Sequence, residues 1–141
     1  FKRYDVHLSP EVKGRILNGG EPLPEIEVYR QLVYANEYME KTTTDRQGRF
    51  SFPQKVIRSR EPGKLLGVEH ITQSITADHE GKTFLLWQTT KTSRNPHKEI
   101  IERLSALNCD LNNPEKLHHF TMQEDERFTH NVQGICRWPD N

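Results

Sequence analysis

The chain has 141 residues, of which 33% are hydrophobic and 28% are charged, a composition typical of one globular domain. Lys plus Arg and Asp plus Glu each number 20, so the formal net charge is zero, without the basic excess usual in nucleic-acid-binding proteins. No run approaches the roughly 18 apolar residues that a membrane-spanning helix needs. We therefore expect a single domain over residues 1–141, with no nucleic-acid partner and no membrane span.

The first third of the chain has the pattern of antiparallel strands separated by short turns. Apolar and charged residues alternate over 12–16, the period of two that a half-buried strand shows. Asn18–Gly20 predicts a turn, because asparagine and glycine adopt positive φ at little cost. Alternation resumes over 26–34, where Arg30 is the one misfit on the apolar face. Residues 42–52 predict a further strand, a tight turn and another strand.

Residues 53–67 predict a long loop that carries cationic side chains around Pro62–Gly63. We expect the apolar pairs Val56–Ile57 and Leu65–Leu66 to anchor the ends of this loop to the body of the domain. In one interpretation the exposed arginines bind carboxylates of a partner or phosphates. In the other, the loop is a solvated segment whose charge is balanced by Glu61.

A second hairpin is predicted from 68–77 and 82–91. Its segment 84–87 is apolar without polar alternation, which indicates a strand covered on both faces. One helix is predicted over 95–108, with Asn95 as its cap, Pro96 at the first helical position and Glu99 in the first turn. We expect this helix to cover the apolar strand. A further strand is expected around 117–122.

Cys109 and Cys136 are the only cysteines. In an exported protein they would form a disulfide that closes a loop of about 27 residues, worth about 3 kcal/mol on the chain-entropy model. The alternative is a pair of buried thiols in a cytosolic protein. The chain begins at Phe1 rather than Met, which indicates either a removed signal peptide or a trimmed chain. Together these features favour the disulfide and a periplasmic or secreted location.

The sequence contains no serine-hydrolase, zinc-protease, phosphate-loop or Cys-x-x-Cys motif. His118 and His119 are adjacent on a predicted strand, so they point to opposite faces and cannot chelate one ion. His70 and His79 flank a predicted hairpin and could approach each other, but no third ligand is evident. We therefore expect no catalytic residue, no metal site and no cofactor.

The first third of the chain resembles the carboxypeptidase-regulatory-like and transthyretin-like β-sandwich families. The pattern of those families appears here as Val12-Lys-Gly14, Gly20-Glu-Pro22-Leu23, Val28 and Thr44-Asp45-Arg-Gln-Gly48-Arg-Phe50-Ser-Phe52. The resemblance implies a mainly β chain, a transthyretin-like antiparallel β-sandwich to which the helix at 95–108 is added. It implies no activity, because such modules are usually accessory or adhesive.

Over nearly its full length the chain also looks like a family of small exported Gram-negative bacterial proteins without a settled function. The shared cues are Tyr4–Gly14, Ser59–Gly63, Leu85–Trp87, Leu107–Leu111 and Ile135–Trp138. This second resemblance implies export and supplies no catalytic residue.

These features lead us to expect a non-enzymatic periplasmic domain that binds another protein. Its most concrete form is an immunity protein that neutralises a toxin delivered between bacteria by type VI secretion. A rigid β scaffold with a long charged loop suits the filling of a partner's cleft. The candidate partner-binding residues are Arg58, Arg60, Lys64, Tyr34 and Tyr38, since arginine and tyrosine are enriched in binding hot spots. The partner and the oligomeric state are left open.

Two alternatives belong to other functional classes. A carbohydrate- or cell-envelope-binding accessory module predicts an exposed row of aromatic side chains, with Trp87 or Trp138 accessible to solvent. A small enzyme requires histidines and acidic groups to converge in a pocket. The tyrosines also have a simpler interpretation, as half-buried strand residues.

Overall fold

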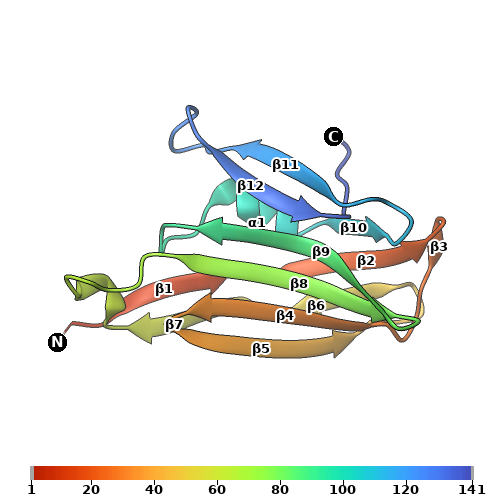
Figure 1. Cartoon of the computed structure of the whole chain (residues 1–141), viewed down its shortest axis with the longest axis horizontal. Coiled ribbons are helices and arrows are strands. Elements are labelled where there is room, and N and C mark those ends of the chain that lie inside the picture. Colours follow the sequence, from red (N-terminus) through yellow and green to blue (C-terminus); the bar gives the residue numbers. More distant parts are fainter. Residues whose placement is uncertain (1, 141) are drawn as a thin grey trace.

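The structure, a computed structural model, describes residues 2–140, which form twelve strands, one α-helix and one 3-10 helix (Figure 1). In chain order the elements are β1 (Tyr4–Ser9), β2 (Val12–Asn18), β3 (Glu21–Pro22), β4 (Glu27–Tyr34), β5 (Asn36–Thr43), β6 (Arg49–Phe52), β7 (Lys55–Ser59), η1 (Glu61–Gly63), β8 (Ile71–His79), β9 (Lys82–Lys91), α1 (Lys98–Leu104), β10 (Leu107–Asp110), β11 (Lys116–Thr121) and β12 (Thr129–Gly134).

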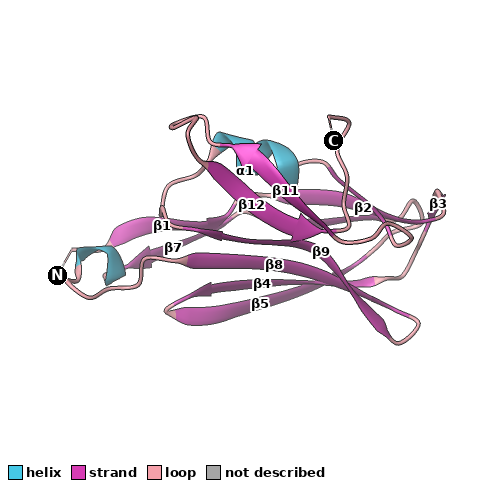
Figure 2. Ribbon diagram, turned by 45° about the horizontal axis from the view of Figure 1, so that its top comes forward, coloured by secondary structure: helices cyan, strands magenta, loops and turns pink. Residues whose placement is uncertain are grey.

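Two layers of strands face each other across the core (Figures 1 and 2). One layer is a six-stranded sheet in the order β11-β12-β9-β8-β4-β5, antiparallel throughout. The other layer contains the β1-β7 pair and a sheet in the order β10-β2-β3, with β6 paired to β2. The predicted mainly β, sandwich-like fold with a single helix is confirmed for the described residues. None of the helices in 2–140 has the length and apolar character needed to cross a bilayer.

The helix is shorter than the sequence pattern predicts, covering Lys98–Leu104 rather than 95–108. His97, not Asn95, occupies the cap position, and its backbone is extended. The helix ends early because the following segment pairs in parallel with β2, where Leu107 lies opposite Gly14. The expected cover is present, since Ile100 packs in the same core cluster as the apolar strand β9.

The expected loop at 53–67 is wrong in its first part. Residues 55–59 form β7, and Val6 of β1 lies opposite Ile57 in this antiparallel pair. The second half of the expected loop, after η1, has no regular structure up to β8. A loop therefore remains, but it is shorter than predicted and begins at the end of β7.

The main core lies between the layers and includes a β-bulge in β9. Ile75 pairs with Trp87 and Thr76 with Leu85, so Leu86 is the extra residue of the bulge. Leu86 and Trp87 are adjacent in sequence, yet both are 0% exposed. The bulge explains how this strand is covered without polar alternation. The remaining members of this core cluster include Val12, Ile16, Val28, Phe50, Ile100, Leu104, Val132 and Trp138.

The predicted disulfide between Cys109 and Cys136 is confirmed. It joins β10 to the segment that follows β12, and both cysteines are fully buried. Beside it, the Arg137 backbone N–H donates to the carbonyl of Asn108, and the indole N–H of Trp138 donates to the carbonyl of Arg103. The C-terminal segment is therefore held both covalently and by hydrogen bonds.

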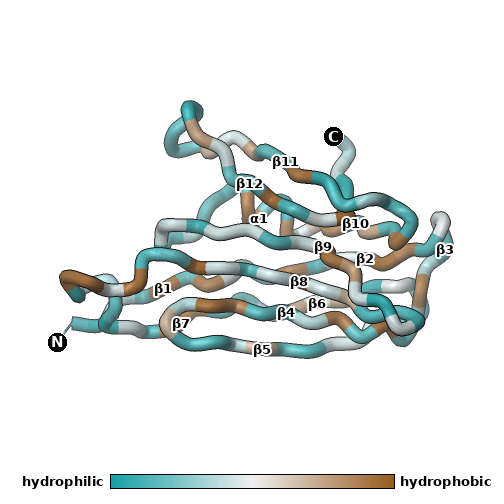
Figure 3. The backbone as a smooth tube through the Cα atoms, in the orientation of Figure 1, coloured by the Kyte–Doolittle hydropathy of each residue, from teal (hydrophilic) through white to brown (hydrophobic). Residues whose placement is uncertain are grey.

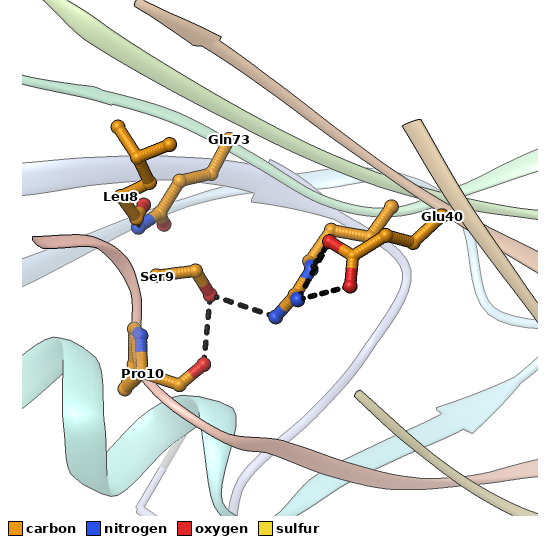
Figure 4. A network of polar contacts seen from close by, with 6 residues as sticks. Leu8, Ser9, Pro10, Glu40 and Gln73 are labelled. Carbon is orange, nitrogen blue, oxygen red and sulfur yellow. Dashed lines mark hydrogen bonds and ion pairs between the residues drawn. The ribbon is translucent and has the colours of Figure 1, made fainter. Parts of the chain in front are cut away.

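Arg30, the misfit of the β4 pattern, is completely buried among apolar side chains. Its guanidinium donates to the Glu40 carboxylate at 2.7 and 2.9 Å and to Ser9 Oγ at 3.3 Å, and it lies 5.0 Å from the ring of Phe52. Figure 4 shows Ser9 and Glu40, with dashed lines for the hydrogen bonds that they accept from this group. The bidentate pair compensates for the burial of the charge, and it joins β4 to β5.

Removing the partner of this buried charge is expected to destabilise the protein strongly. Glu40→Ala should lower the free energy of unfolding by about 3–5 kcal/mol, because it leaves a guanidinium buried without a carboxylate. Glu37→Ala removes an exposed carboxylate from the same strand and should change stability by less than about 0.5 kcal/mol. Adding Arg30→Met to Glu40→Ala should restore much of the loss. Denaturant unfolding measures all three, and equal losses for Glu40→Ala and Glu37→Ala would contradict the prediction.

Gly134 allows β12 to approach the bulge in β9. A Cβ atom at this position would overlap the carbonyl oxygen of Leu86 and lie 3.1 Å from the backbone nitrogen of Trp87. These are backbone atoms in a paired strand, so they cannot move aside as a flexible side chain can. Position 134 therefore requires glycine, because any side chain would overlap these backbone atoms.

Gly134→Ala is therefore expected to cost roughly 2 kcal/mol or more of folding stability. Gly63→Ala is the matched control, because the nearest atom to its Cβ belongs to the Tyr4 side chain, at 3.2 Å, and its φ is not positive. Thermal unfolding of the two variants measures the difference. A Gly134→Ala protein as stable as the wild type would show that β12 does not approach β9 this closely.

Candidate functional site

The predicted cationic residues lie at one end of the molecule, around η1 (Figure 1). Arg58 is on β7, and its guanidinium donates to the Asp5 carboxylate of β1 at 2.9 Å, which lowers the pKa of that carboxyl. Arg60 precedes η1, and Lys64 follows it and forms an ion pair with Glu61. The structure therefore places Arg60 and Lys64 on the β7–β8 connection (residues 60–70) and Arg58 near the end of β7.

The two predicted tyrosines differ in exposure. Tyr34 is 3% exposed and packs in a second core cluster with Val6 and Ile71, and burial raises the pKa of its hydroxyl. Tyr38 is half-buried on β5, and the ammonium of Lys55 lies 5.3 Å from its ring. Tyr34 therefore offers a partner little surface, while the edge of its side chain lines a hollow at the same end of the molecule.

This hollow has a volume of about 400 Å³ and lies between the β7–β8 connection and the segment after β9. Its lining includes Tyr34, Pro62, Val68 and Arg94. It brings one predicted binding residue next to the loop that carries the predicted cations.

Leu65 and Leu66 do not anchor the loop to the body of the domain, as the sequence pattern predicts. They are 97% and 96% exposed, the most exposed large hydrophobic side chains among the described residues. Figure 3 shows the hydrophobic segment at the tip of the connection before β8. The turn beneath them is ordered by backbone hydrogen bonds from Lys64 to the Glu61 carbonyl and from Gly67 to the Lys64 carbonyl. The loop thus presents two leucines to solvent on a hydrogen-bonded turn.

Trp87 and Trp138 are 0% and 6% exposed, so the accessible tryptophan that the carbohydrate-binding alternative predicts is not found. Their rings pack edge to face with centroids 6.0 Å apart. They belong to the core rather than to a surface for stacking sugars.

A second group of functional side chains lies where α1 meets β12. His97 is the cap residue of α1 and Glu99 lies in its first turn, while Glu124 is on the loop between β11 and β12 and His130 is on β12. The sequence pattern does not bring these four residues together. The predicted cap, Asn95, lies two residues before the observed cap, and β12, whose single large apolar residue is Val132, is not predicted.

The four side chains form two histidine–carboxylate hydrogen bonds. His97 Nδ1 lies 2.7 Å from Glu124 Oε1, and His130 Nε2 lies 2.6 Å from Glu99 Oε1. The imidazole rings are 4.6 Å apart at an interplanar angle of 65°. One nitrogen or oxygen of each residue lies within 4.8 Å of those of the other three. We call this group the His–Glu cluster.

Burial dominates the electrostatics of the His–Glu cluster. His97, Glu99 and His130 are buried, with exposures of 8%, 6% and 6%, while Glu124 is exposed. Burial lowers the pKa of His97, and its hydrogen bond to Glu124 acts in the opposite direction. Within the described residues, His97 Nε2 and Glu99 Oε2 are buried without a hydrogen-bond partner.

The His–Glu cluster lies beside a cavity of about 840 Å³. His97, Glu124 and His130 line it, together with Lys91 and the exposed ring of Phe128. The small-enzyme alternative requires this kind of convergence of histidines and acids at a pocket. In the structure each histidine of the cluster is hydrogen-bonded to a carboxylate.

The histidine pairs that the sequence suggested are not brought together. His118 is buried, stacked on Phe120, while His119 is exposed, so the two point to opposite faces as expected. His70 and His79 do not approach each other, because His70 precedes β8 and His79 ends it. A strand of nine residues separates them by about 30 Å.

Comparison with known proteins matches the chain to a protein family. A family model described as a domain of unknown function (DUF6795) matches residues 12–114. The matched segment contains the β7–β8 connection, His97 and Glu99, and it ends before Glu124 and His130. No curated protein matches the chain at a significant level.

Lys91, which lines the cavity beside the His–Glu cluster, predicts a pH dependence of stability. It is 4% exposed, its ammonium donates to the Asn95 carbonyl at 2.9 Å, and burial lowers its pKa from 10.5 to about 8. Between pH 8 and 10.5 the unfolded chain therefore holds more protons at this residue than the folded protein. The contribution of Lys91 to stability consequently rises with pH across this window.

Lys91→Met should remove that rise. Relative to the variant, the wild type is expected to gain about 3 kcal/mol of unfolding free energy as pH increases from 7.5 to 10.5. Lys82→Met, at an exposed lysine of the same strand, is the control and should show no such change. Urea unfolding at several pH values measures the differences. Parallel curves for wild type and Lys91→Met would contradict the predicted pKa.

Proposed function

For this chain, which belongs to the DUF6795 family, we propose a role as a non-enzymatic domain that binds another protein through the β7–β8 connection. The observation that carries the proposal is the near-complete exposure of Leu65 and Leu66 beside Arg60 and Lys64. Covering two adjacent exposed leucines with a partner's surface lowers the free energy, because apolar area is removed from water. The flanking cations supply the polar rim that protein interfaces usually have.

The local structure supports display of these leucines for binding. Pro62 lies within η1, and the Glu61 backbone N–H donates to Ser59 Oγ at 3.1 Å, so the base of the turn is restrained before a partner arrives. A restrained loop loses less conformational entropy on binding than a flexible one. The hollow lined by Tyr34 and Arg94 lies next to this loop and offers a place for a side chain of the partner.

The specific form that we propose is a periplasmic immunity protein that neutralises a toxin delivered by type VI secretion. The Cys109–Cys136 disulfide supports an oxidising compartment such as the periplasm. An ordered projecting loop suits the blocking of a toxin's cleft, and the cationic rim suits a partner with acidic groups around that cleft.

The test is association with the product of a neighbouring toxin-like gene. Wild-type protein should bind it and protect cells that express it. The double variant Leu65→Ser/Leu66→Ser should weaken binding by roughly a hundredfold, because about 3 kcal/mol of apolar burial is lost. Met39→Ser, at a side chain 58% exposed on β5, is the matched control and should bind like the wild type. Calorimetry measures the affinities.

Two outcomes would count against the proposal. Absence of both binding and protection removes the immunity role. Binding that the double variant leaves unchanged, or that Met39→Ser weakens equally, shows that the β7–β8 connection is not the interface.

A further inference from the structure

We propose that His97, Glu99, Glu124 and His130 form a binding site for a divalent transition-metal ion, and that zinc is the ion their donor atoms fit best. This inference is independent of the protein-binding role, since none of the four residues lies on the β7–β8 connection.

The first argument is geometric. One donor atom from each of the four residues lies within 4.8 Å of those of the other three. Four ligands at about 2.0–2.1 Å from a tetrahedral zinc ion are about 3.3 Å from one another. The widest separations between the donor atoms would close by about 1.5 Å or less. Side-chain rotation covers such distances without a change of fold.

The second argument is the chemistry of the donors. Two imidazole nitrogens and two carboxylate oxygens are a donor set that suits zinc and its first-row neighbours. Calcium and magnesium prefer oxygen ligands alone, so the two histidines disfavour them. Two carboxylates also bring two negative charges, which a divalent ion neutralises. The ammonium of Lys91, on the wall of the same cavity, opposes a cation, but it provides only one positive charge.

The third argument concerns buried polar atoms. His97 Nε2 and Glu99 Oε2 are buried and have no hydrogen-bond partner among the described residues. Buried polar atoms are nearly always paired, and an unpaired one costs about 1–3 kcal/mol. A bound ion accounts for lone pairs of this kind at a place where two histidines and two glutamates already converge.

The positions of the ligands also suit a site that an ion can reach. Glu99 and His130 are fixed by the core, since neighbouring Ile100 and Val132 are core residues. Glu124 is exposed on the β11–β12 loop and faces the cavity of about 840 Å³. Two ligands are thus held in place by the core, and Glu124 reaches the site from its open side.

The competing explanation is a polar cluster held only by its two histidine–carboxylate hydrogen bonds. Glu124→Gln distinguishes the two, because the amide oxygen of glutamine can still accept a hydrogen bond from His97 but is a poor ligand for zinc. Glu126→Gln is the matched control, since this exposed glutamate lies on the same loop and outside the cluster.

The experiment is a calorimetric titration of the chelator-treated full chain, without a polyhistidine tag, with zinc chloride. Wild type and Glu126→Gln should bind one ion with a Kd on the order of 1 µM or tighter. Glu124→Gln should weaken binding about tenfold to a hundredfold, with the melting temperature of the metal-free protein unchanged. Cobalt chloride should give the intense visible absorption of a tetrahedral site in the wild type, and His130→Gln should abolish it.

Zinc binding weaker than about 100 µM in the wild type would overturn the proposal. Equal affinity of wild type and Glu124→Gln would also overturn it, because the ion would then occupy exposed surface histidines such as His119. If His130→Gln lowers the melting temperature, the cobalt spectrum of Glu124→Gln takes its place as the spectroscopic test.

Discussion

The close approach of β12 to β9 at Gly134 is the contact on which the His–Glu cluster depends. The space there admits no Cβ, because the carbonyl of Leu86 in the β9 bulge occupies it. The Ile135 backbone N–H donates to the Leu85 carbonyl, and Thr89 Oγ1 donates to the Asn131 carbonyl, so β12 is held along its length. His130 is four residues before Gly134 on this strand, and β9 leads into the segment that ends at His97. The same strand contact therefore sets the position of His130 relative to β9.

Polar side chains at inward positions are treated in two different ways in this structure. Arg30 is buried, but each nitrogen of its guanidinium donates a hydrogen bond to Glu40 or Ser9, and the ring of Phe52 lies 5.0 Å away. A fully satisfied group of this kind specifies the packing of strands and needs no ligand. In the His–Glu cluster, by contrast, two buried atoms are left without a partner among the described residues. The buried atoms of the first group have hydrogen-bond partners, whereas two of those in the second do not. For this reason we interpret the first group as structural and propose ligand binding for the second.

The elements that could be predicted from the sequence are those whose inward positions are apolar. The strands at 12–16 and 26–34 and the hairpin around Asp78–Gly81 were predicted for this reason, and β8 and β9 confirm the last of them. β12 was missed because its inward residues include His130 and Gly134, which break the apolar pattern. His130 belongs to the His–Glu cluster, and Gly134 leaves room for the backbone of β9. β1 and β7 were missed because their pairing joins segments about 50 residues apart, which local pattern does not report. The contact between the His97 and His130 rings could not be predicted for the same reason, because the two residues are far apart in the sequence.

The two proposed sites are carried by different residues but border on one short segment, Thr92–Asn95. On one side, Arg94 lines the hollow beside the β7–β8 connection, and its guanidinium donates to the Asp5 carbonyl. On the other side, the Asn95 carbonyl accepts the hydrogen bond of Lys91 at the cavity of the His–Glu cluster. A partner that fills the hollow touches a residue adjacent to the one that holds this ammonium in place. A bound partner can therefore shift the ammonium of Lys91 and change the affinity of the His–Glu cluster for an ion. In the free protein the position of Lys91 depends on the fold alone.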